Sequence, residues 1–163
     1  MQIILFDTAA RKQFYPFSLT RPLASFRCGI FTTKERWEFV LKQELFTLTE
    51  DYLSAKYPFT SNDEGDYLYI NAAVVCSHEL LQEIHALPAE SVLLQKETPV
   101  AIHTKNKLRF PVSVEEYRHC HAVELRSSVD FFQYPFDLVT LNDRLLRLDY
   151  LYGRRRGCSS LHL

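Results

Sequence analysis

Short, continuous apolar runs that end in a polar residue mark the expected strands of this sequence. The first run is Gln2 to Phe6, closed by Asp7, and the second is Tyr67 to Ile70, closed by Asn71. A run without polar alternation is typical of a strand buried on both faces of a parallel or mixed sheet. Runs rich in β-branched and aliphatic residues predict further short strands at Ser91 to Leu94, Val100 to His103 and Ala122 to Leu125.

The clearest helix signal follows Thr32. Thr32 and Glu35 have the spacing of a capping box, and the apolar residues that follow share one helical face: Trp37, Val40, Leu41 and Leu45. We expect Trp37, Val40 and Leu41 to pack on the sheet. The opposite side carries Lys34, Glu38 and Lys42, which we expect to face solvent, with Glu38 and Lys42 paired four residues apart.

Two further helices are predicted downstream. Ser77 can cap a helix that Pro88 stops and whose apolar face is Leu80, Leu81, Ile84 and Leu87. After Pro135, a single helix is predicted that ends at Gly153, and Arg154 to Arg156 lie just beyond it as a solvated helix end. The apolar side of this helix is formed by Leu138, Leu141, Leu145, Leu148 and Tyr152. Thr47 to Leu53 fits either a short strand or a helical turn.

Alternating strands and helices predict one α/β sandwich domain over residues 1–163. In such folds, ligands bind outside the carboxyl ends of the strands. The loops after Phe6 and after Ile70 are therefore the expected site, and the strands that precede them are expected to be neighbours or near-neighbours.

Composition and charge narrow the possible partners. The 163 residues are 47% hydrophobic and 24% charged, with a formal net charge of -1, so no global field favours nucleic acid or an anionic membrane. No apolar run approaches the ~20 residues that span a bilayer. We therefore expect a soluble, cytoplasmic protein without nucleic-acid or membrane partners.

Glycine and cysteine usage excludes some common sites. None of the four glycines precedes Gly29, so the sequence contains neither a dinucleotide-binding GxGxxG motif nor a P-loop. The four cysteines are scattered singly and are expected to be reduced thiols: Cys28, Cys76, Cys120 and Cys158. In a strand, His119 and His121 would share a face opposite Cys120, and because no third ligand is identifiable, zinc is not expected.

A basic loop follows the first strand. Thr20, Arg21 and Arg27 lie in a segment that Pro16 and Pro22 punctuate. Arginine forks match phosphate oxygens in a bidentate manner, so this loop could hold a diphosphate. The alternative is a proline-stiffened surface loop whose arginines face water or pair with carboxylates.

Several segments together carry a family resemblance. Leu5-Phe6-Asp7 and the stretch from Tyr15 to Trp37, with its Thr20-Arg21-Pro22, Arg27 and Gly29-Ile30, resemble the opening of a divergent bacterial sugar nucleotidyltransferase family. This family is similar to the bifunctional N-acetylglucosamine-1-phosphate uridylyltransferase and glucosamine-1-phosphate acetyltransferase. The remaining matches are Ile70-Asn71-Ala72, Phe136-Asp137-Leu138, Asn142 and Asp149-Tyr150.

The resemblance implies a fold and an activity. The fold is a three-layer sandwich with a mixed, mostly parallel sheet, nucleotide-diphospho-sugar transferase-like and compatible with a truncated form. The activity is transfer of a nucleotidyl group, preferably uridylyl, from a nucleoside triphosphate to a sugar 1-phosphate such as N-acetylglucosamine 1-phosphate, with Mg²⁺. The resemblance is also compatible with a homo-oligomer.

Site roles follow from the same resemblance and from side-chain chemistry. Arg21 would clamp phosphate with Arg27 as its support, and Thr20 would contact the nucleotide or sugar. Asn71 would contact sugar, ribose or a hydrated magnesium ion, and Asp7 would anchor the loop or the metal.

The sequence also departs from ordinary sugar nucleotidyltransferases. Leu23 replaces their lysine, the glycine-rich turn is missing, and Asn71 stands where they usually carry a metal-binding aspartate. Without hexapeptide repeats before Leu163, acetyltransferase activity is not expected from this polypeptide. A catalytically silent domain for nucleotide-sugar binding or assembly is therefore the rival interpretation.

Overall fold

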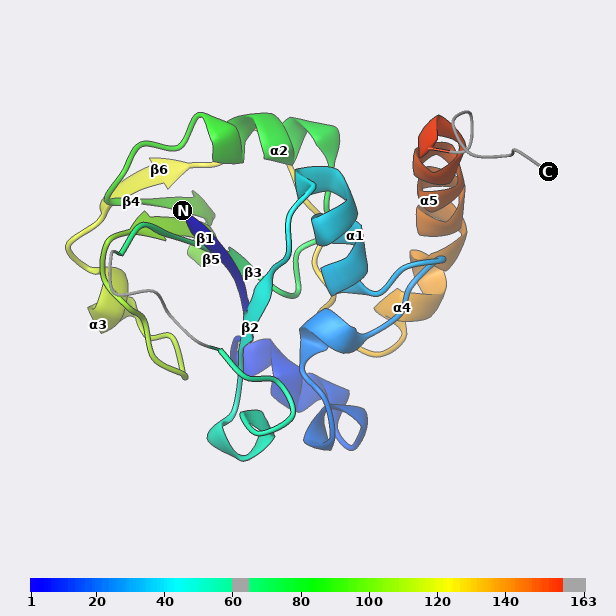
Figure 1. The fold of residues 1–163 in the computed structure, drawn as a ribbon, viewed down its shortest axis with the longest axis horizontal. Helices are drawn as coiled ribbons and strands as arrows, with labels where there is room; N and C mark the ends of the chain where they lie inside the picture. Colours follow the sequence, from blue (N-terminus) through cyan, green and yellow to red (C-terminus); the bar gives the residue numbers. More distant parts are fainter. Residues whose placement is uncertain (60–64, 157–163) are drawn as a thin grey trace.

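The computed structural model describes residues 1–59 and 65–156, and side chains as far as residue 153. Its centre is a six-stranded sheet in the order β2-β1-β3-β5-β4-β6 (Figure 1). Every strand except β5 runs in the same direction, which confirms the mixed, mostly parallel sheet. The strands are β1 Gln2–Phe6, β2 Phe46–Leu48, β3 Tyr67–Asn71, β4 Ser91–Gln95, β5 Thr98–Thr104 and β6 His121–Glu124.

The two strands predicted to be neighbours are adjacent at the centre of the sheet. β1 and β3 pair in parallel, with Gln2 opposite Tyr67 and Phe6 opposite Asn71. Ile4, Leu5 and Ile70 are fully buried, because both faces of these strands are covered. The ambiguous Thr47–Leu53 segment contains the end of β2 and then a 3₁₀ turn, η4 Asp51–Leu53.

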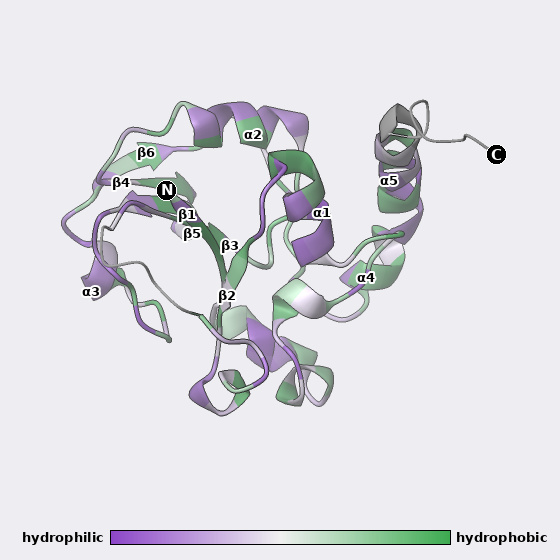
Figure 2. Ribbon diagram, viewed as in Figure 1, coloured by the Kyte–Doolittle hydropathy of each residue, from purple (hydrophilic) through white to green (hydrophobic). Residues whose placement is uncertain are grey.

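Helices and loops cover the two faces unequally. Alternate residues of β1 belong to separate core clusters, Ile3 and Leu5 on the face of α1 and α2, and Ile4 and Phe6 on the other. Short α3 and the loops around it cover that second face, and both α1 and α2 combine hydrophilic and hydrophobic residues (Figures 1 and 2). The remaining elements are η1 Ala9–Phe14, η2 Phe17–Leu19, η3 Leu23–Ser25, α1 Thr33–Leu41, α2 His78–His85, α3 Val114–Tyr117, α4 Asp137–Thr140 and α5 Asn142–Arg156.

Helix α1 confirms the expected phase but not the expected ion pair. Thr32 and Glu35 form the capping box, and Trp37 is fully buried. Lys42 instead ends the helix with a left-handed φ of 56°. The helix therefore stops before Leu45, and Glu38 pairs with Lys34 at 3.4 Å rather than with Lys42.

The C-terminal helix differs from its prediction in two ways. The segment breaks at Leu141 into α4 and α5 rather than forming one helix, and α5 continues through Gly153 to Arg156. A Cβ at Gly153 would meet no described atom within 4 Å, so this position of the helix has room for a side chain. Within the described part of the chain, no helix is both long and apolar enough to span a membrane.

Helix α5 is attached to the body of the protein by a buried ion pair. Asp149 is fully buried and accepts hydrogen bonds from Arg36 Nε and Nη2, each at 2.8 Å. Its Oδ2 also accepts from the backbone amides of Ile30, at 2.9 Å, and Phe31, at 3.2 Å. The segment before α1 and the last helix are thereby fixed to each other.

Candidate functional site

A cleft of about 390 Å³ opens at the carboxyl ends of β1 and β3, where the sequence places the site. This volume is within the range of roughly 300–1,000 Å³ that is usual for small-molecule sites. The cleft is bordered by the chain after β1, the end of β3, the β4–β5 turn and the segment before α4. Its lining residues are Thr8, Ala10, Gln13, Asn71, Ala73, Gln95, Lys96, Thr98, Phe131, Phe132, Gln133 and Tyr134.

Asn71 lies at the base of this cleft with its side chain fully engaged. It is 1% exposed, its Nδ2 donates to Pro99 O at 2.9 Å, and its Oδ1 accepts from Ala73 N at 2.9 Å. The amide therefore fixes the turn after β3 against β5. Its oxygen is a neutral amide oxygen, which is a weaker magnesium ligand than the carboxylate it replaces.

The segment before α4 is held in place as one wall of the cleft. Phe132 N donates to Ala73 O at 2.7 Å, and Val75 N donates to Asp130 O at 2.9 Å. Gln95 binds the same segment, since its side-chain amide both donates to Val129 O at 3.0 Å and accepts from Val129 N at 2.8 Å. These contacts bring residues from β3, β4 and the C-terminal third of the chain to one opening.

The charge of the cleft comes from one turn. Among the described residues that line it, Lys96 is the only charged side chain, and it is exposed in the turn between β4 and β5 with a φ of 57°. Gln13, Thr98 and Gln133 supply exposed neutral polar groups around it. The lining thus offers one cation and several hydrogen-bonding groups, which suits a polyhydroxylated ligand that carries phosphate.

Asp7 does not reach the cleft. It is fully buried beneath the loop, where Leu23 N donates to Oδ1 at 3.0 Å and the Thr49 hydroxyl donates to Oδ2 at 2.6 Å. Arg11 Nε lies 3.3 Å from Oδ2. Burial raises the pKa of Asp7 to about 6 against the opposing effects of these partners. Of the two roles considered for Asp7, the contacts fit the loop anchor.

The structure does not bring the other predicted site residues to the cleft. Thr20 and Arg21 are exposed at the end of η2 and just after it, outside the residues that line the opening. Arg27 lies beside the start of α1, where it pairs with Glu35 at 3.4 Å and also donates to Ile30 O. Phosphate binding by Arg21 and Arg27 therefore stays a prediction, and this conformation does not place them at the cleft.

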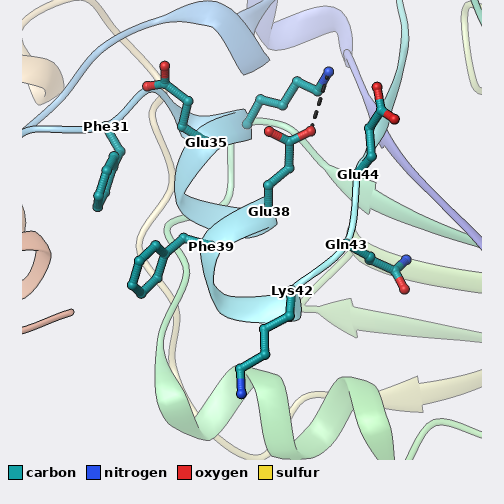
Figure 3. Close-up of a pocket in the computed structure, with 8 residues that line it drawn as sticks. Phe31, Glu35, Glu38, Phe39, Lys42, Gln43 and Glu44 are labelled. Carbon is teal, nitrogen blue, oxygen red and sulfur yellow. Dashed lines mark ion pairs between the residues drawn. The ribbon is translucent and has the colours of Figure 1, made fainter. Parts of the chain in front are cut away.

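A second, larger hollow of about 800 Å³ lies on the outer side of α1 (Figure 3). Lys34 and Glu38 pair with each other there. The Phe39 ring stacks between Phe31 and Tyr152, with ring centroids 5.6 and 5.8 Å apart, and so links α1 to α5. We therefore attribute this surface to helix packing and assign it no ligand.

The residues that sequence reasoning missed belong to the β4–β5 turn and to the wall before α4. Lys96 lies between two predicted strands, at the carboxyl end of the first, so a turn at the same edge of the sheet was a readable signal. Gln133 has no such signal. It reaches the cleft through backbone pairing between residues distant in the sequence.

Comparisons with known proteins identify a family and a similar fold. The sugar nucleotidyl transferase family profile matches residues 3–155. A Bacillus anthracis protein assigned as a glucose-1-phosphate thymidylyltransferase and solved in complex with sucrose has a similar fold, with a TM-score of 0.52, 11% identity and coverage of 90% of this chain and 95% of that one. A search of curated proteins finds no match. Since the family profile covers nearly the whole chain, the protein belongs to the sugar nucleotidyl transferase family.

Proposed function

We propose that the cleft binds a nucleoside triphosphate and a sugar 1-phosphate and that the chain transfers the nucleotidyl group between them. The nucleotidyl group is uridylyl and the acceptor is N-acetylglucosamine 1-phosphate, following the resemblance in sequence. The two substrates, UTP and N-acetylglucosamine 1-phosphate, are cytoplasmic metabolites, so a cytoplasmic location belongs to the same proposal.

The observation that carries the proposal is the position of the cleft. It opens beyond the carboxyl ends of β1 and β3, at the place where α/β sheets bind their ligands. Lys96 supplies a positive charge for a phosphate group, and the neutral side chains of Gln13, Thr98 and Gln133 suit hydroxyl and base edges. Membership of the sugar nucleotidyl transferase family supports nucleotides and sugar phosphates as the ligands.

The chemistry would be an in-line displacement. An oxygen of the sugar phosphate attacks the α-phosphorus of the triphosphate, and pyrophosphate leaves. This chain would contribute by aligning two anionic substrates and offsetting part of their charge through Lys96.

Magnesium does not fit the described lining of the cleft. None of the described lining residues carries a carboxylate, Asp7 is buried among its own partners, and Asn71 offers only a neutral amide oxygen. Hard cations such as Mg²⁺ prefer one or two carboxylates together with substrate phosphates. We therefore assign no reaction step to a protein-bound magnesium ion.

The same observation favours a second candidate function. A cleft that holds a nucleotide sugar without a metal-binding carboxylate suits a domain that binds the product and does not make it. Lys96 and the neutral groups around it would serve binding equally well in this case.

Two measurements separate these functions. Calorimetric titration with UDP-N-acetylglucosamine tests binding, and pyrophosphate release from UTP and N-acetylglucosamine 1-phosphate, with and without magnesium, tests transfer. Lys96→Gln should weaken binding roughly ten- to a hundredfold, because a charge-assisted hydrogen bond contributes about 1.5–3 kcal/mol. Lys105→Gln, an exposed lysine just beyond the opposite end of β5, is the matched control and should bind normally.

Each result has a defined meaning. Binding with pyrophosphate release supports transfer, whereas binding without release under any condition supports the silent binding domain. Loss of affinity in Arg21→Ala but not in Lys96→Gln would assign phosphate binding to Arg21 in the loop after β1 rather than to Lys96 in the β4–β5 turn. Absence of binding by nucleotides, sugar phosphates and nucleotide sugars would overturn both candidates.

A further inference from the structure

Three potential metal ligands meet at the end of the sheet that lies away from the cleft. Glu90 immediately precedes β4, and His119 and Cys120 form the turn between α3 and β6. One ligand atom from each lies within 4.8 Å of the other two. The cluster is built from segments about thirty residues apart, because β4 and β6 pair in parallel with Ser91 opposite His121.

Two distances within the cluster are close to those of a tetrahedral zinc site. His119 Nε2 lies 3.1 Å from Glu90 Oε2 and 3.6 Å from Cys120 Sγ. Bond lengths of about 2.0 Å to nitrogen or oxygen and 2.3 Å to sulfur separate ligands in a tetrahedron by about 3.3 and 3.6 Å. The ligand atoms of Glu90 and Cys120 lie within 4.8 Å of each other, so one ion can contact all three atoms once side-chain rotation brings this pair to a similar separation.

Glu90 is already oriented for such a role. Its Oε1 accepts from Lys105 N at 2.8 Å, and its Oε2 lies 3.1 Å from the Thr104 hydroxyl. Its backbone has a φ of 53°, which is uncommon for a residue other than glycine, and its carbonyl accepts from His121 N at 2.8 Å. Both carboxylate oxygens are thus held by neighbouring donors, with Oε2 also facing His119, and such hydrogen bonds commonly orient the ligands of a metal site.

We infer that Glu90, His119 and Cys120 bind one Zn²⁺ ion. A thiolate, an imidazole and a carboxylate together favour zinc over magnesium or calcium, which prefer oxygen ligands. Zinc binding displaces the thiol proton of Cys120 to solvent, and the sulfur then bonds the metal as thiolate. Water takes the fourth position, since Glu90 and His119 are 38% and 40% exposed in their side chains.

The site would fasten an edge strand. β6 is the outermost strand on its side of the sheet and contributes only four residues. An ion shared by Glu90 and the start of β6 would tie this edge to β4 where the two strands begin. The inference is independent of the proposed function, because the cleft lies at the other ends of β4 and β5.

This arrangement also corrects an expectation from the sequence. The sequence predicts His119 and His121 on the same face of a strand as a potential pair of metal ligands, but β6 begins only at His121. His119 lies in the preceding turn, which places it beside Cys120 and Glu90 instead. The third ligand could not be identified from the sequence because Glu90 is distant along the chain.

The test uses the full chain carrying Cys158→Ser, so that this thiol cannot compete for metal. Zinc content after chelator treatment, reloading and dialysis gives the stoichiometry, and substitution with Co²⁺ reports a sulfur ligand through its thiolate-to-metal absorption band. We expect one zinc per chain, the cobalt band and a higher melting temperature with zinc. Glu90→Gln and His119→Gln should each lower zinc affinity at least tenfold, whereas His121→Gln, the exposed neighbour, should not.

Cys120→Ser should abolish the cobalt band while one weaker metal site remains. If that buried substitution prevents folding, Glu90→Gln and His119→Gln decide the question, since both residues are partly exposed. Folded protein that binds no zinc at micromolar concentration would overturn the inference. Zinc binding that is unchanged in Glu90→Gln and His119→Gln would overturn it equally.

Discussion

Asp7 lies at the carboxyl end of the central strand β1, and its carboxylate has no contact with solvent. Leu23 N, the Thr49 hydroxyl and Arg11 surround it, so its charge fixes the long loop to the sheet. Burial nonetheless has the larger effect and raises the pKa from 3.8 to about 6. The loop is therefore attached through a group whose ionisation costs folding free energy.

This pKa leads to a pH dependence of stability. An acid whose pKa is raised on folding binds its proton more tightly in the folded state, so its contribution to stability falls as pH rises from about 4 to about 6. The free energy of unfolding of the wild type, taken relative to Asp7→Asn, should decline through this window and stay level above it. Urea unfolding of both proteins between pH 3.5 and pH 8 measures the difference. A rise through the same window would show that the Arg11 charge outweighs burial.

Asp149 is a second fully buried carboxylate, and it accepts four hydrogen bonds. Asp149→Ala leaves Arg36 buried without its partner and should lower the free energy of unfolding by about 3–5 kcal/mol. Asp143→Ala, which removes an exposed pair with Arg147 on the same helix, should leave it nearly unchanged. Chemical denaturation provides both values, and equal effects would refute the anchoring role of Asp149.

At the scale of elements, the helical conformation of Gly153 can be tested directly. Alanine is more favourable than glycine in a helix interior by roughly 0.5–1 kcal/mol, and an added Cβ would meet nothing there. Gly153→Ala should therefore raise the melting temperature slightly. The comparison is Gly29→Ala, which should destabilise, because Gly29 has a φ of 79° and its Cβ would come within 2.5 Å of Asp149 Oδ2. Destabilisation by Gly153→Ala would indicate that the helix does end there.

The existence of elements was predictable, whereas several of their boundaries were not. Continuous apolar runs and a capping box are local signals, and they located β1, β3 and the start of α1. The ends of α1 and α5 depend on the backbone conformations of Lys42 and Gly153, which residue type alone does not determine. Lys42 adopts a left-handed conformation that glycine more commonly supplies, and Gly153 remains helical although glycine often ends helices.

At the scale of the whole molecule, the sequence predicted the edge of the sheet that holds the cleft but not most of its lining. Asn71 could be identified because it directly follows a recognisable strand. Lys96 follows a predicted strand and had a readable signal, whereas the position of Gln133 depends on contacts between segments distant in sequence. The arginines of the basic loop have suitable chemistry, but the fold of the loop keeps them outside the residues that line the cleft.

The cleft and the proposed zinc site lie at opposite ends of the β4–β5 hairpin, which predicts their independence. Neither site shares a residue with the other, so the two ligands should have little coupling free energy. Zinc and UDP-N-acetylglucosamine should together raise the melting temperature by about the sum of their separate shifts. Titration of each ligand in the presence of the other gives the coupling directly, and an affinity change above about fivefold would contradict independence.

The central position of β1 also has a consequence for synthesis on the ribosome. Its register with β3 joins Gln2 to Tyr67, a separation of 65 residues, so β1 is made well before β3 and must wait for this neighbour. Until then the apolar run Ile3 to Phe6 has an open edge that can pair with other chains. We expect nascent chains that have exposed residues only up to Asp66 to be more sensitive to protease at β1 than chains that have exposed Asn71. Equal sensitivity would show that β2 alone protects the strand, whereas the expected difference would identify Ile3 to Phe6 as a segment exposed to other chains until β3 is made.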